Sequence, residues 1–347
     1  MYIETIRWKK NALNIIDQTQ LPEKLRILKL RDIKEVWGAI KKLRVRGAPA
    51  IGIAGAFGVY LGIRNFKIND YEKCKKEVER MISYLATSRP TAVNLFWALE
   101  RIRKIVDLSR DKSIKEIKKL ILNEAMRMIE EDDKVCKTIG EVGAGLLKSG
   151  DTVLTHCNAG GLATASYGTA LSIVYRAVEQ GKKISVFVDE TRPLLQGARL
   201  TTWELMRNKI PVTLICDNMS ATIMAKGLIQ AVVVGADRIA MNGDLANKIG
   251  TYGLAILAKY HNIPFYCAAP LSTFDPQINS GAQIPIEERS KDEIISYCGK
   301  RIAPANVKVF NPAFDVTPAK FVTVFITEKG VLKPPFQKSI KLALLEA

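Results

Sequence analysis

The sequence predicts an α/β protein in which a mainly helical N-terminal domain is followed by a Rossmann-like, doubly wound parallel-sheet C-terminal domain. Two observations predict this order. Apolar residues recur at helical spacing from Asp32 to about Gly150, whereas after Gly150 short runs rich in Val and Ile alternate with helical stretches. Such alternation favours right-handed crossovers and a parallel sheet. We place the helical domain at residues 1–130 and the sheet domain at 131–347, since this length suits two domains.

Helical patterns account for most of the first domain. The first helix begins after Asp32, which stands in an N-cap position before an amphipathic run. The stretch from Ala48 to Ile63 predicts a buried helix, because it is interrupted by glycines and is too short to span a bilayer comfortably. Three further helical segments are predicted at residues 70–86, 91–107 and 113–131.

Six apolar runs predict the strands of the second domain. Their β-branched residues and lack of alternation are typical of strands buried on both faces. The runs cover residues 151–156, 184–190, 212–217, 231–237, 264–269 and 321–327. Ligands of such sheets bind beyond the carboxyl ends of the strands. These ends carry His156-Cys157-Asn158, Asp189-Glu190-Thr191-Arg192, Asp217-Asn218 and Gly235-Ala236-Asp237.

The net charge of +17 is compatible with nucleic acid, membranes or anionic small molecules as partners. Basic residues between Lys24 and Arg46 alternate with Leu and Ile at helical spacing, and no aromatic residues are interleaved for base stacking. We interpret them as a solvated helix face and expect neither a nucleic-acid nor a membrane partner. Charged residues near the N-terminus, such as Glu4 and Arg7, replace the apolar run of a signal peptide, which predicts a cytoplasmic location.

Cysteine and histidine usage argues against a structural metal site. The six cysteines are far apart without a CxxC pair, and the chain has two histidines. A dinucleotide fingerprint is also missing, because the glycines at Gly143 and Gly145 precede a predicted strand instead of following it. We therefore expect no metal and no cofactor.

Cys157 stands between a predicted strand and a Gly-containing turn that leads into a helix. Amides at a helix N-terminus stabilise an anion, either a bound phosphate or the Cys157 thiolate. The alternative is a buried cysteine in a tight turn. Because the other five cysteines lack this setting, we favour a functional role for Cys157.

Asp237 directly follows an apolar strand, and Asn247 and Lys248 lie shortly after it. A carboxyl group at such an edge loses hydration, which disfavours its charged form and suits it to donate a proton. An Asp at this position can also be a simple cap. Asn247 and Lys248, which could hold a phosphate or hydroxyl groups, favour the functional interpretation.

Two arginines at helix entrances are candidate phosphate ligands. Arg46 precedes Gly47 and Ala48 at the start of the apolar helix, and Arg89 precedes a second helix. Arginine binds phosphate oxygens in bidentate fashion, and the exposed amides of Gly47 and Ala48 could add to the cradle.

Ten segments along nearly the whole chain together resemble the methylthioribose-1-phosphate isomerase family. Relatives of that family include ribose-1,5-bisphosphate isomerases and regulatory subunits of a translation guanine-nucleotide exchange factor. The segments are ETIRWKKNALNIIDQTQLP, RGAPAIG, SRPTAVNLFWAL, THCNAGG, ETRPLLQGARLT, DNMSATIM, GADRIAMNGDLANKIGTYG, APLSTFD, IPIEERS and NPAFDVTP. Their number and order make the resemblance specific.

The resemblance implies a homodimeric aldose-ketose isomerase of methionine salvage, a route of methionine biosynthesis, acting on a phosphorylated pentose. The implied reaction converts 5-methylthioribose 1-phosphate to 5-methylthioribulose 1-phosphate, and an apolar pocket would also admit 5-deoxyribose 1-phosphate. Cys157 would be the active-site cysteine and Asp237 the proton donor. The implied substrate-binding residues are Arg46, Gly47, Ala48, Arg89, Gln196, Asn247 and Lys248.

Two other functions stay open. A ribose-1,5-bisphosphate isomerase would use the same Cys and Asp chemistry but needs a basic pocket for a second phosphate. The long N-terminal segment favours the methylthioribose branch over this one. A non-catalytic regulatory subunit would bind protein partners instead, and the presence of both Cys157 and Asp237 speaks against it.

Overall fold

A computed structural model of the chain describes residues 3–67, 69–90, 92–297 and 299–346. The chain forms two compact units. The first, here called the helical unit, contains residues 2–137 together with 160–168, and the second, the sheet unit, contains 138–159 and the residues from 169 onward. The division after residue 137 lies inside helix α5 (Ile114–Ala144), as does the predicted boundary at 130.

The helical unit begins with an antiparallel sheet that the sequence patterns did not predict. Its strands are β1 (Ile6–Lys9), β2 (Ala12–Ile16) and β3 (Ile27–Leu30). β3 lies within the basic run for which a helix face was expected, so that expectation was wrong before residue 33. The physical reason is the pairing of β3 with β2, which buries Leu30 opposite Leu13.

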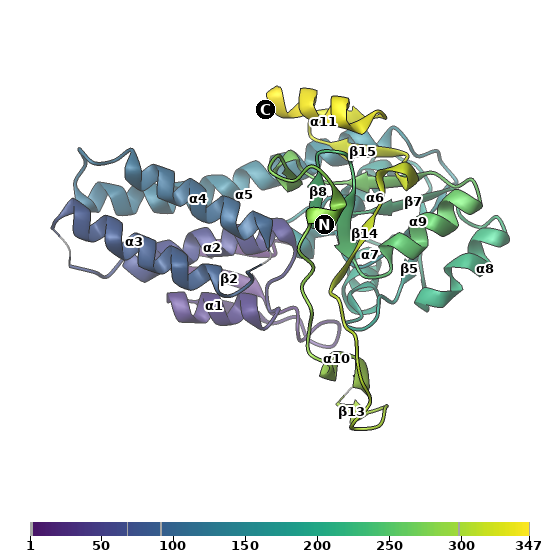
Figure 1. Ribbon diagram of the computed structural model, residues 1–347, viewed down its shortest axis with the longest axis horizontal. Coiled ribbons are helices and arrows are strands. Elements are labelled where there is room, and N and C mark those ends of the chain that lie inside the picture. The colour runs from purple at the N-terminus through teal and green to yellow at the C-terminus, as the bar shows by residue number, and fades with distance from the viewer. Residues whose placement is uncertain (1–2, 68, 91, 298, 347) are drawn as a thin grey trace. The chain divides into compact units, whose positions relative to one another are not determined.

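Four predicted helices follow. They are α1 (Ile33–Lys41), α2 (Ala48–Ile63), α3 (Tyr71–Ala86) and α4 (Val93–Asp107), drawn in purple and blue in Figure 1. The predicted N-cap is confirmed, because the side chain of Asp32 accepts a hydrogen bond from the Glu35 amide at 2.8 Å. The burial predicted for α2 is also confirmed, and its glycines allow close packing: a Cβ on Gly52 would lie 2.6 Å from the Asn94 carbonyl oxygen of α4.

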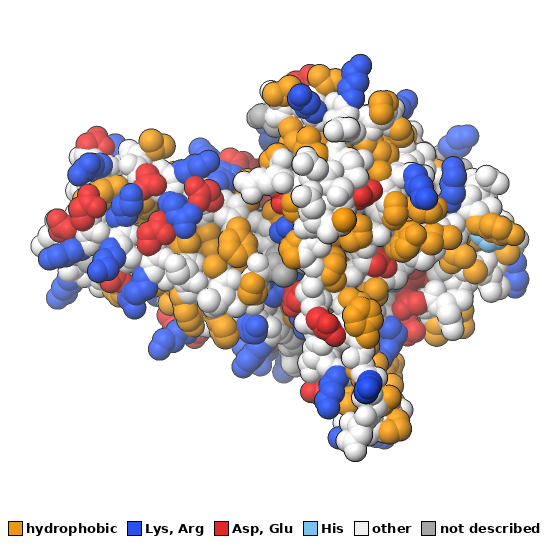
Figure 2. Space-filling model, in the orientation of Figure 1, with side chains coloured by type: hydrophobic (Ala, Val, Ile, Leu, Met, Phe, Trp, Pro, Cys, Tyr) orange, Lys and Arg blue, Asp and Glu red, His pale blue; other side chains and the backbone are white. Residues whose placement is uncertain are grey.

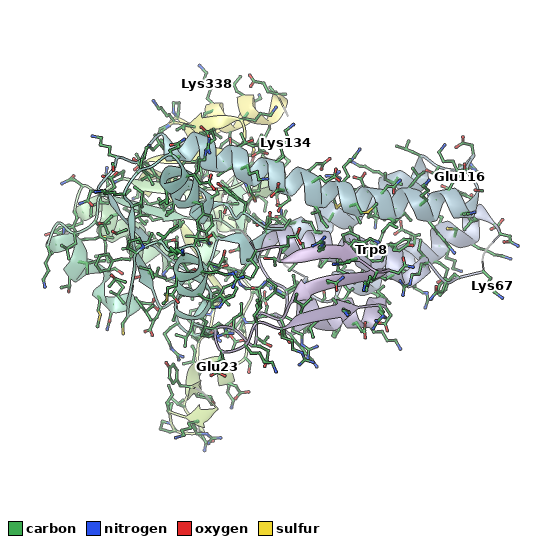
Figure 3. All side chains as sticks on the ribbon, turned by 180° about the vertical axis from the view of Figure 1, so that it is seen from behind. Trp8, Glu23, Lys67, Glu116, Lys134 and Lys338 are labelled. Atoms are coloured by element: carbon green, nitrogen blue, oxygen red, sulfur yellow. The ribbon has the colours of Figure 1, made fainter. Side chains whose placement is uncertain are left out.

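Helix α5 extends thirteen residues beyond its predicted end at 131. Figure 3 shows Glu116 and Lys134 far apart along it. Glycine weakens an isolated helix, but here Gly140 and Gly143 allow α5 to pack closely on α6 (Ala170–Glu179). A Cβ on Gly140 would lie 2.8 Å from the Ser172 carbonyl oxygen. Tertiary packing therefore continues the helix through residues of low helix propensity.

All six predicted strands are present in the central sheet of the sheet unit, which confirms the doubly wound α/β fold class. They are β4 (Thr152–Thr155), β5 (Ser185–Asp189), β6 (Val212–Ile215), β7 (Ala231–Val234), β10 (Phe265–Ala268) and β15 (Val324–Thr327). These strands are mutually parallel, and β16 (Gly330–Leu332) adds an antiparallel edge. The order is β16-β15-β10-β7-β4-β5-β6.

The strand order reverses between β4 and β7. From β4 the chain continues outward to β5 and β6, and it then returns to β7 and continues the other way to β10 and β15. The helices of these connections include α7 (Thr202–Arg207), α8 (Ser220–Ala225) and α9 (Thr251–Tyr260). The C-terminal helix α11 (Phe336–Leu345) packs Phe336 on Phe325 of β15, with ring centroids 4.8 Å apart.

A second, smaller sheet of the sheet unit was not predicted from the sequence. Its order is β11-β8-β9-β14, formed by β11 (Phe274–Asp275), β8 (Arg238–Ala240), β9 (Leu245–Lys248) and β14 (Phe314–Thr317). Remaining elements are α10 (Asp292–Ile295), β12 (Ser296–Tyr297), β13 (Lys300–Arg301) and the 3-10 turns Gly161–Ala163, Asp217–Met219, Leu271–Thr273, Gly281–Gln283 and Ala319–Phe321.

Acidic and basic side chains are interspersed over the visible face of the helical unit (Figure 2). On that face the positive charge is not concentrated in one uninterrupted basic surface. None of the helices in the described part of the chain is both long enough and apolar enough to cross a membrane.

Candidate active site

Cys157 and Asp237 follow the two strands between which the sheet reverses its order. Cys157 comes two residues after β4, and Asp237 three residues after β7. The two strands are hydrogen-bonded in parallel, with Leu154 opposite Val232. Their loops touch, because a Cβ built on Gly235 would lie 2.8 Å from the Cβ of Ala159. The fold thus brings the two loops together at the place where doubly wound sheets bind ligands.

The backbone of Cys157 is held by two buried threonines. Its amide donates to Oγ1 of Thr191 at 2.8 Å, and its carbonyl oxygen accepts from Oγ1 of Thr201 at 2.6 Å. Cys157 and Thr191 both have a positive φ, 63° and 65°. Side-chain-bearing residues adopt this conformation at a cost of about 1–3 kcal/mol, and such strain clusters at functional sites. From the sequence Thr191 was noted as part of a polar strand end, without a role, and Thr201 was not noted, although both lie in the ETRPLLQGARLT segment.

Asp237 lies half-buried between β7 and β8. Its amide donates to the Ala246 carbonyl oxygen at 2.9 Å, and β8 pairs with β9 so that Arg238 is opposite Ala246. Extending this antiparallel ladder by one residue brings Asp237 opposite Asn247. The second sheet therefore positions the candidate acid beside two candidate substrate ligands, Asn247 and Lys248.

Asn247 and Lys248 are both buried. The side-chain Nδ2 of Asn247 donates to Oγ1 of Thr251 at 3.1 Å. The Lys248 ammonium donates to the Ala313 carbonyl oxygen at 2.9 Å and lies 4.7 Å from the ring centroid of Phe314. Buried ammonium groups need compensating partners, and these contacts hold the charge in a defined position.

Gln196 offers a buried acceptor. The residue is 5% exposed, and its Oε1 has no hydrogen-bond partner among the described residues. It directly precedes a short π-helix, Gly197–Thr201, whose last residue is the threonine that holds Cys157. An unsatisfied buried acceptor costs about 1–3 kcal/mol, which a hydroxyl group of a ligand would offset.

The remaining predicted ligands belong to the helical unit. Gly47 is the N-cap of α2 with φ of 90°, and Ala48 is the first helical residue. A Cβ on Gly47 would lie 2.3 Å from the Ala163 carbonyl oxygen, so only glycine fits. Arg46 is buried, and Arg89 lies half-buried between α3 and α4. The first amides of α2 form a site suited to an anion.

One cluster of the sheet unit has the composition of a metal site. His156, Asp189 and Asp217 present ligand atoms within 4.8 Å of one another. Each group already has hydrogen-bond partners: both ring nitrogens of His156 have an acceptor, and the Asp217 oxygens accept from the amides of Thr191 and Arg192. A hydrogen-bond network accounts for this cluster without an ion.

Replacing Gly197 by Ala is expected to lower the free energy of unfolding by about 3 kcal/mol. The new Cβ would lie 1.7 Å from the Asp189 carbonyl oxygen, which accepts from Thr191 Oγ1. The measurement is urea unfolding. The matched control is Gly253→Ala in α9, where no atom lies within 4 Å of the new Cβ and a gain of about 0.5–1 kcal/mol is expected. Equal stability of the two variants would contradict the packing described.

Comparison with known proteins identifies the family. A model of the initiation factor 2 subunit family matches residues 44–334, well over half of the chain. The chain belongs to this family. Within it, the chain is 55% identical over 342 residues to a 5-deoxyribose 1-phosphate isomerase of Moorella thermoacetica, which covers 99% of this chain and 97% of that protein. It is also 55% identical over 341 residues to a methylthioribose-1-phosphate isomerase of Thermotoga maritima, covering 98% of each.

Solved structures agree with this placement in the initiation factor 2 subunit family. The 5-methylthioribose 1-phosphate isomerase of Pyrococcus horikoshii superposes with a TM-score of 0.92 at 46% identity, covering 99% of this chain and 96% of that chain. A protein of A. fulgidus described as translation initiation factor eIF-2B, subunit delta, has a TM-score of 0.86 at 49% identity, covering 98% and 99%. The resemblance to the methylthioribose-1-phosphate isomerase family is confirmed, and the chain is an enzyme of the isomerase class.

Proposed function

We propose that this protein is a sugar-phosphate isomerase that converts 5-methylthioribose 1-phosphate to 5-methylthioribulose 1-phosphate in methionine salvage, with 5-deoxyribose 1-phosphate as a second substrate. The names of the two relatives at 55% identity support both substrates. The observation that carries the proposal is the contact between the Cys157 loop and the Asp237 loop at the reversal of the sheet. A thiol and a carboxyl group there are suited to moving protons on one bound sugar.

The substrate's anomeric carbon is tied to phosphate, so the ring cannot open as it does in a free sugar. In the proposed mechanism neutral Asp237 donates a proton to the ring oxygen and the ring opens. The Cys157 thiolate then removes the proton of the second carbon, which gives an enediol-like intermediate. Asp237, now a carboxylate, takes the proton of the 2-hydroxyl group, and the Cys157 thiol returns its proton to the first carbon, which gives the ketose phosphate. An alternative route moves the hydrogen of the second carbon directly to the first carbon as a hydride, and Cys157 then stabilises charge.

The phosphate is proposed to be bound by charged side chains and helix amides. Arg46, Arg89 and Lys248 supply positive charge, while the amides of Gly47 and Ala48 at the start of α2 donate hydrogen bonds. Asn247 and Gln196 would bind hydroxyl groups. Fixing the sugar in this way reduces the entropic cost of reaching the transition state.

Replacing Gln196 by Met is expected to raise KM by up to about tenfold, since one neutral hydrogen bond is worth about 0.5–1.5 kcal/mol. The free energy of unfolding should stay the same or rise, because Oε1 accepts no hydrogen bond from the described residues. Steady-state kinetics and urea unfolding measure the two quantities. Gln180→Met, at the exposed end of α6, is the matched control with unchanged KM. An unchanged KM in the Gln196 variant would remove this residue from the substrate site.

One assay tests the proposed function directly. The purified protein is incubated separately with 5-methylthioribose 1-phosphate, 5-deoxyribose 1-phosphate and ribose 1,5-bisphosphate, and ketose formation is followed by NMR. Turnover of the first two is expected. Turnover of the bisphosphate alone would replace the proposal by a ribose-1,5-bisphosphate isomerase. No turnover of any would favour a non-catalytic regulatory subunit; the A. fulgidus protein is described as a subunit of a translation initiation factor.

We further propose that the protein acts in the cytoplasm as a homodimer, without nucleic-acid or membrane partners. Light scattering after size-exclusion chromatography measures the mass directly, and a dimer is expected at twice the 38.5 kDa of the chain. A monomer at micromolar concentration would contradict this assembly.

A further inference from the structure

His156 is the residue immediately before Cys157, and its imidazole is almost completely buried. Nδ1 lies 3.0 Å from Oδ2 of Asp189 at the end of β5, and Nε2 lies 2.9 Å from the carbonyl oxygen of Ile249. The imidazole therefore bridges two segments of the sheet unit that are distant in the sequence. Neither the sequence motifs nor the proposed chemistry assigns it a role.

The partners of His156 define its protonation. A carbonyl oxygen only accepts, so Nε2 must carry a hydrogen. Burial raises the pKa of Asp189, whereas its hydrogen bonds with His156 and with the Ser220 hydroxyl, at 2.6 Å to its other oxygen, act in the opposite direction and favour the carboxylate. Beside an Asp189 carboxylate Nδ1 also donates, which makes the ring an imidazolium. Burial alone would lower the pKa of His156, but the hydrogen bond and charge of Asp189 outweigh burial and the pKa is raised.

Three carboxyl groups from different elements act on the imidazolium. Asp189 is at the end of β5, Asp217 follows β6, and Asp315 is in β14. Asp315 accepts from the amides of Gly250 and Tyr252 at the start of α9. Without the positive charge of His156, these three carboxyl groups would lose a compensating charge that lies one residue from Cys157, which would disfavour a thiolate there.

His156 also ties the Cys157 loop to the segment that carries Asn247 and Lys248. Ile249, whose carbonyl oxygen it binds, follows Lys248 directly. The next residue, Gly250, has φ of 105°, and a Cβ there would lie 2.8 Å from Cε1 and 3.0 Å from Nε2 of the imidazole. The backbone at Gly250 thus packs closely against the ring, where a side chain at residue 250 would not fit.

We propose that His156 is a positioning residue that acts as a buried imidazolium. It links the Cys157 loop to the Asn247–Lys248 segment. Its positive charge compensates the negative charge of Asp189, Asp217 and Asp315. Its importance for catalysis rests on the proposed function, but its charge and its effect on the thiol are properties of the protein without substrate. Two measurements without substrate therefore test it.

The first test uses the unaltered full-length chain. The chain has two histidines, so nitrogen NMR of ¹⁵N-histidine-labelled protein gives two imidazole spin systems, and His261→Gln assigns them. We expect both ring nitrogens of His156 to carry hydrogen at neutral pH, whereas a neutral ring there would overturn the proposal. This result does not depend on whether any variant folds.

The second test measures the alkylation rate of the Cys157 peptide by iodoacetamide as a function of pH, resolved by mass spectrometry. His156→Gln keeps a donor for the Ile249 carbonyl but removes the charge, so the midpoint should move up by about one pH unit. His261→Gln, at the C-terminal cap of α9, is the matched control with an unchanged midpoint. An unchanged midpoint in a folded His156→Gln protein would overturn the proposal.

Kinetics then separates this proposal from the proposed function. If the unaltered protein turns over a sugar phosphate, His156→Gln should lower kcat at least about tenfold, with the pH-rate profile displaced in the same direction as the alkylation midpoint. A kcat within twofold of the unaltered protein would overturn the positioning role. If none of the three sugar phosphates reacts, the proposed function fails while the NMR and alkylation results still decide the state of His156.

Discussion

Replacing Asp237 by Asn is expected to lower turnover by at least about a hundredfold, the usual contribution of a general acid. Asn has the same shape but gives up no proton to the ring oxygen. The substitution keeps the backbone amide that donates to the Ala246 carbonyl oxygen and the size of the side chain, so the fold should be retained. The measurement is the initial rate of ketose formation at saturating 5-methylthioribose 1-phosphate.

Asp151→Asn is the matched control for this experiment. Asp151 precedes β4 and so lies at the amino edge of the same sheet, where its carboxylate accepts from the Lys148 amide at 2.7 Å. An asparagine carbonyl oxygen can accept the same bond, so activity should stay near normal. Near-normal activity in the Asp237 variant would show that another group donates the proton.

Replacing Cys157 by Ser is expected to lower turnover by at least about a hundredfold as well. A serine hydroxyl is a far weaker acid than a thiol, so little of it is ionised to remove a hydrogen from carbon. Thr191 and Thr201 hold the backbone of residue 157 by hydrogen bonds that the substitution does not remove, so the turn should be retained. The rate is measured in the same NMR assay.

The exposed Cys216, which follows β6, supplies the matched control, and Cys216→Ser should leave the rate unchanged. The reaction in deuterated water adds a second readout for Cys157. Incorporation of deuterium from solvent into the ketose supports proton removal by the thiolate. Complete retention of the substrate hydrogen together with a fully active Cys157→Ser protein would exclude the thiol from the reaction.

Local sequence patterns predicted the elements that are marked by a capping residue or by a run of apolar residues. The N-cap Asp32, the apolar helix Ala48–Ile63 and the six strands of the central sheet can each be recognised from residues that are close together in the sequence. The short strands β8, β9 and β14 were not recognised. They contain three or four residues each, and partners such as Asn247 and Asp315 are far apart in the sequence.

The candidate residues Cys157 and Asp237 could be proposed from the sequence because both follow apolar strands, and ligands of a doubly wound sheet bind at those ends. The residues that hold the Cys157 backbone in place could not be proposed in this way. The roles of Thr191 and Thr201 were not predicted because threonines are common, and their hydrogen bonds to Cys157 reach across 34 and 44 residues.

The sequence by itself determined the fold class, the order of its helices and major strands, and the family, since each depends on the identity and spacing of residues along the chain. The tertiary structure alone decided which of those residues meet. The reversal of the sheet between β4 and β7 brings the Cys157 and Asp237 loops into contact, and β9 brings Asn247 beside them. The tertiary structure also gives His156 two acceptors from separate segments, Asp189 and Ile249. The physical reason is that burial and hydrogen bonding depend on proximity in space and not on position in the chain.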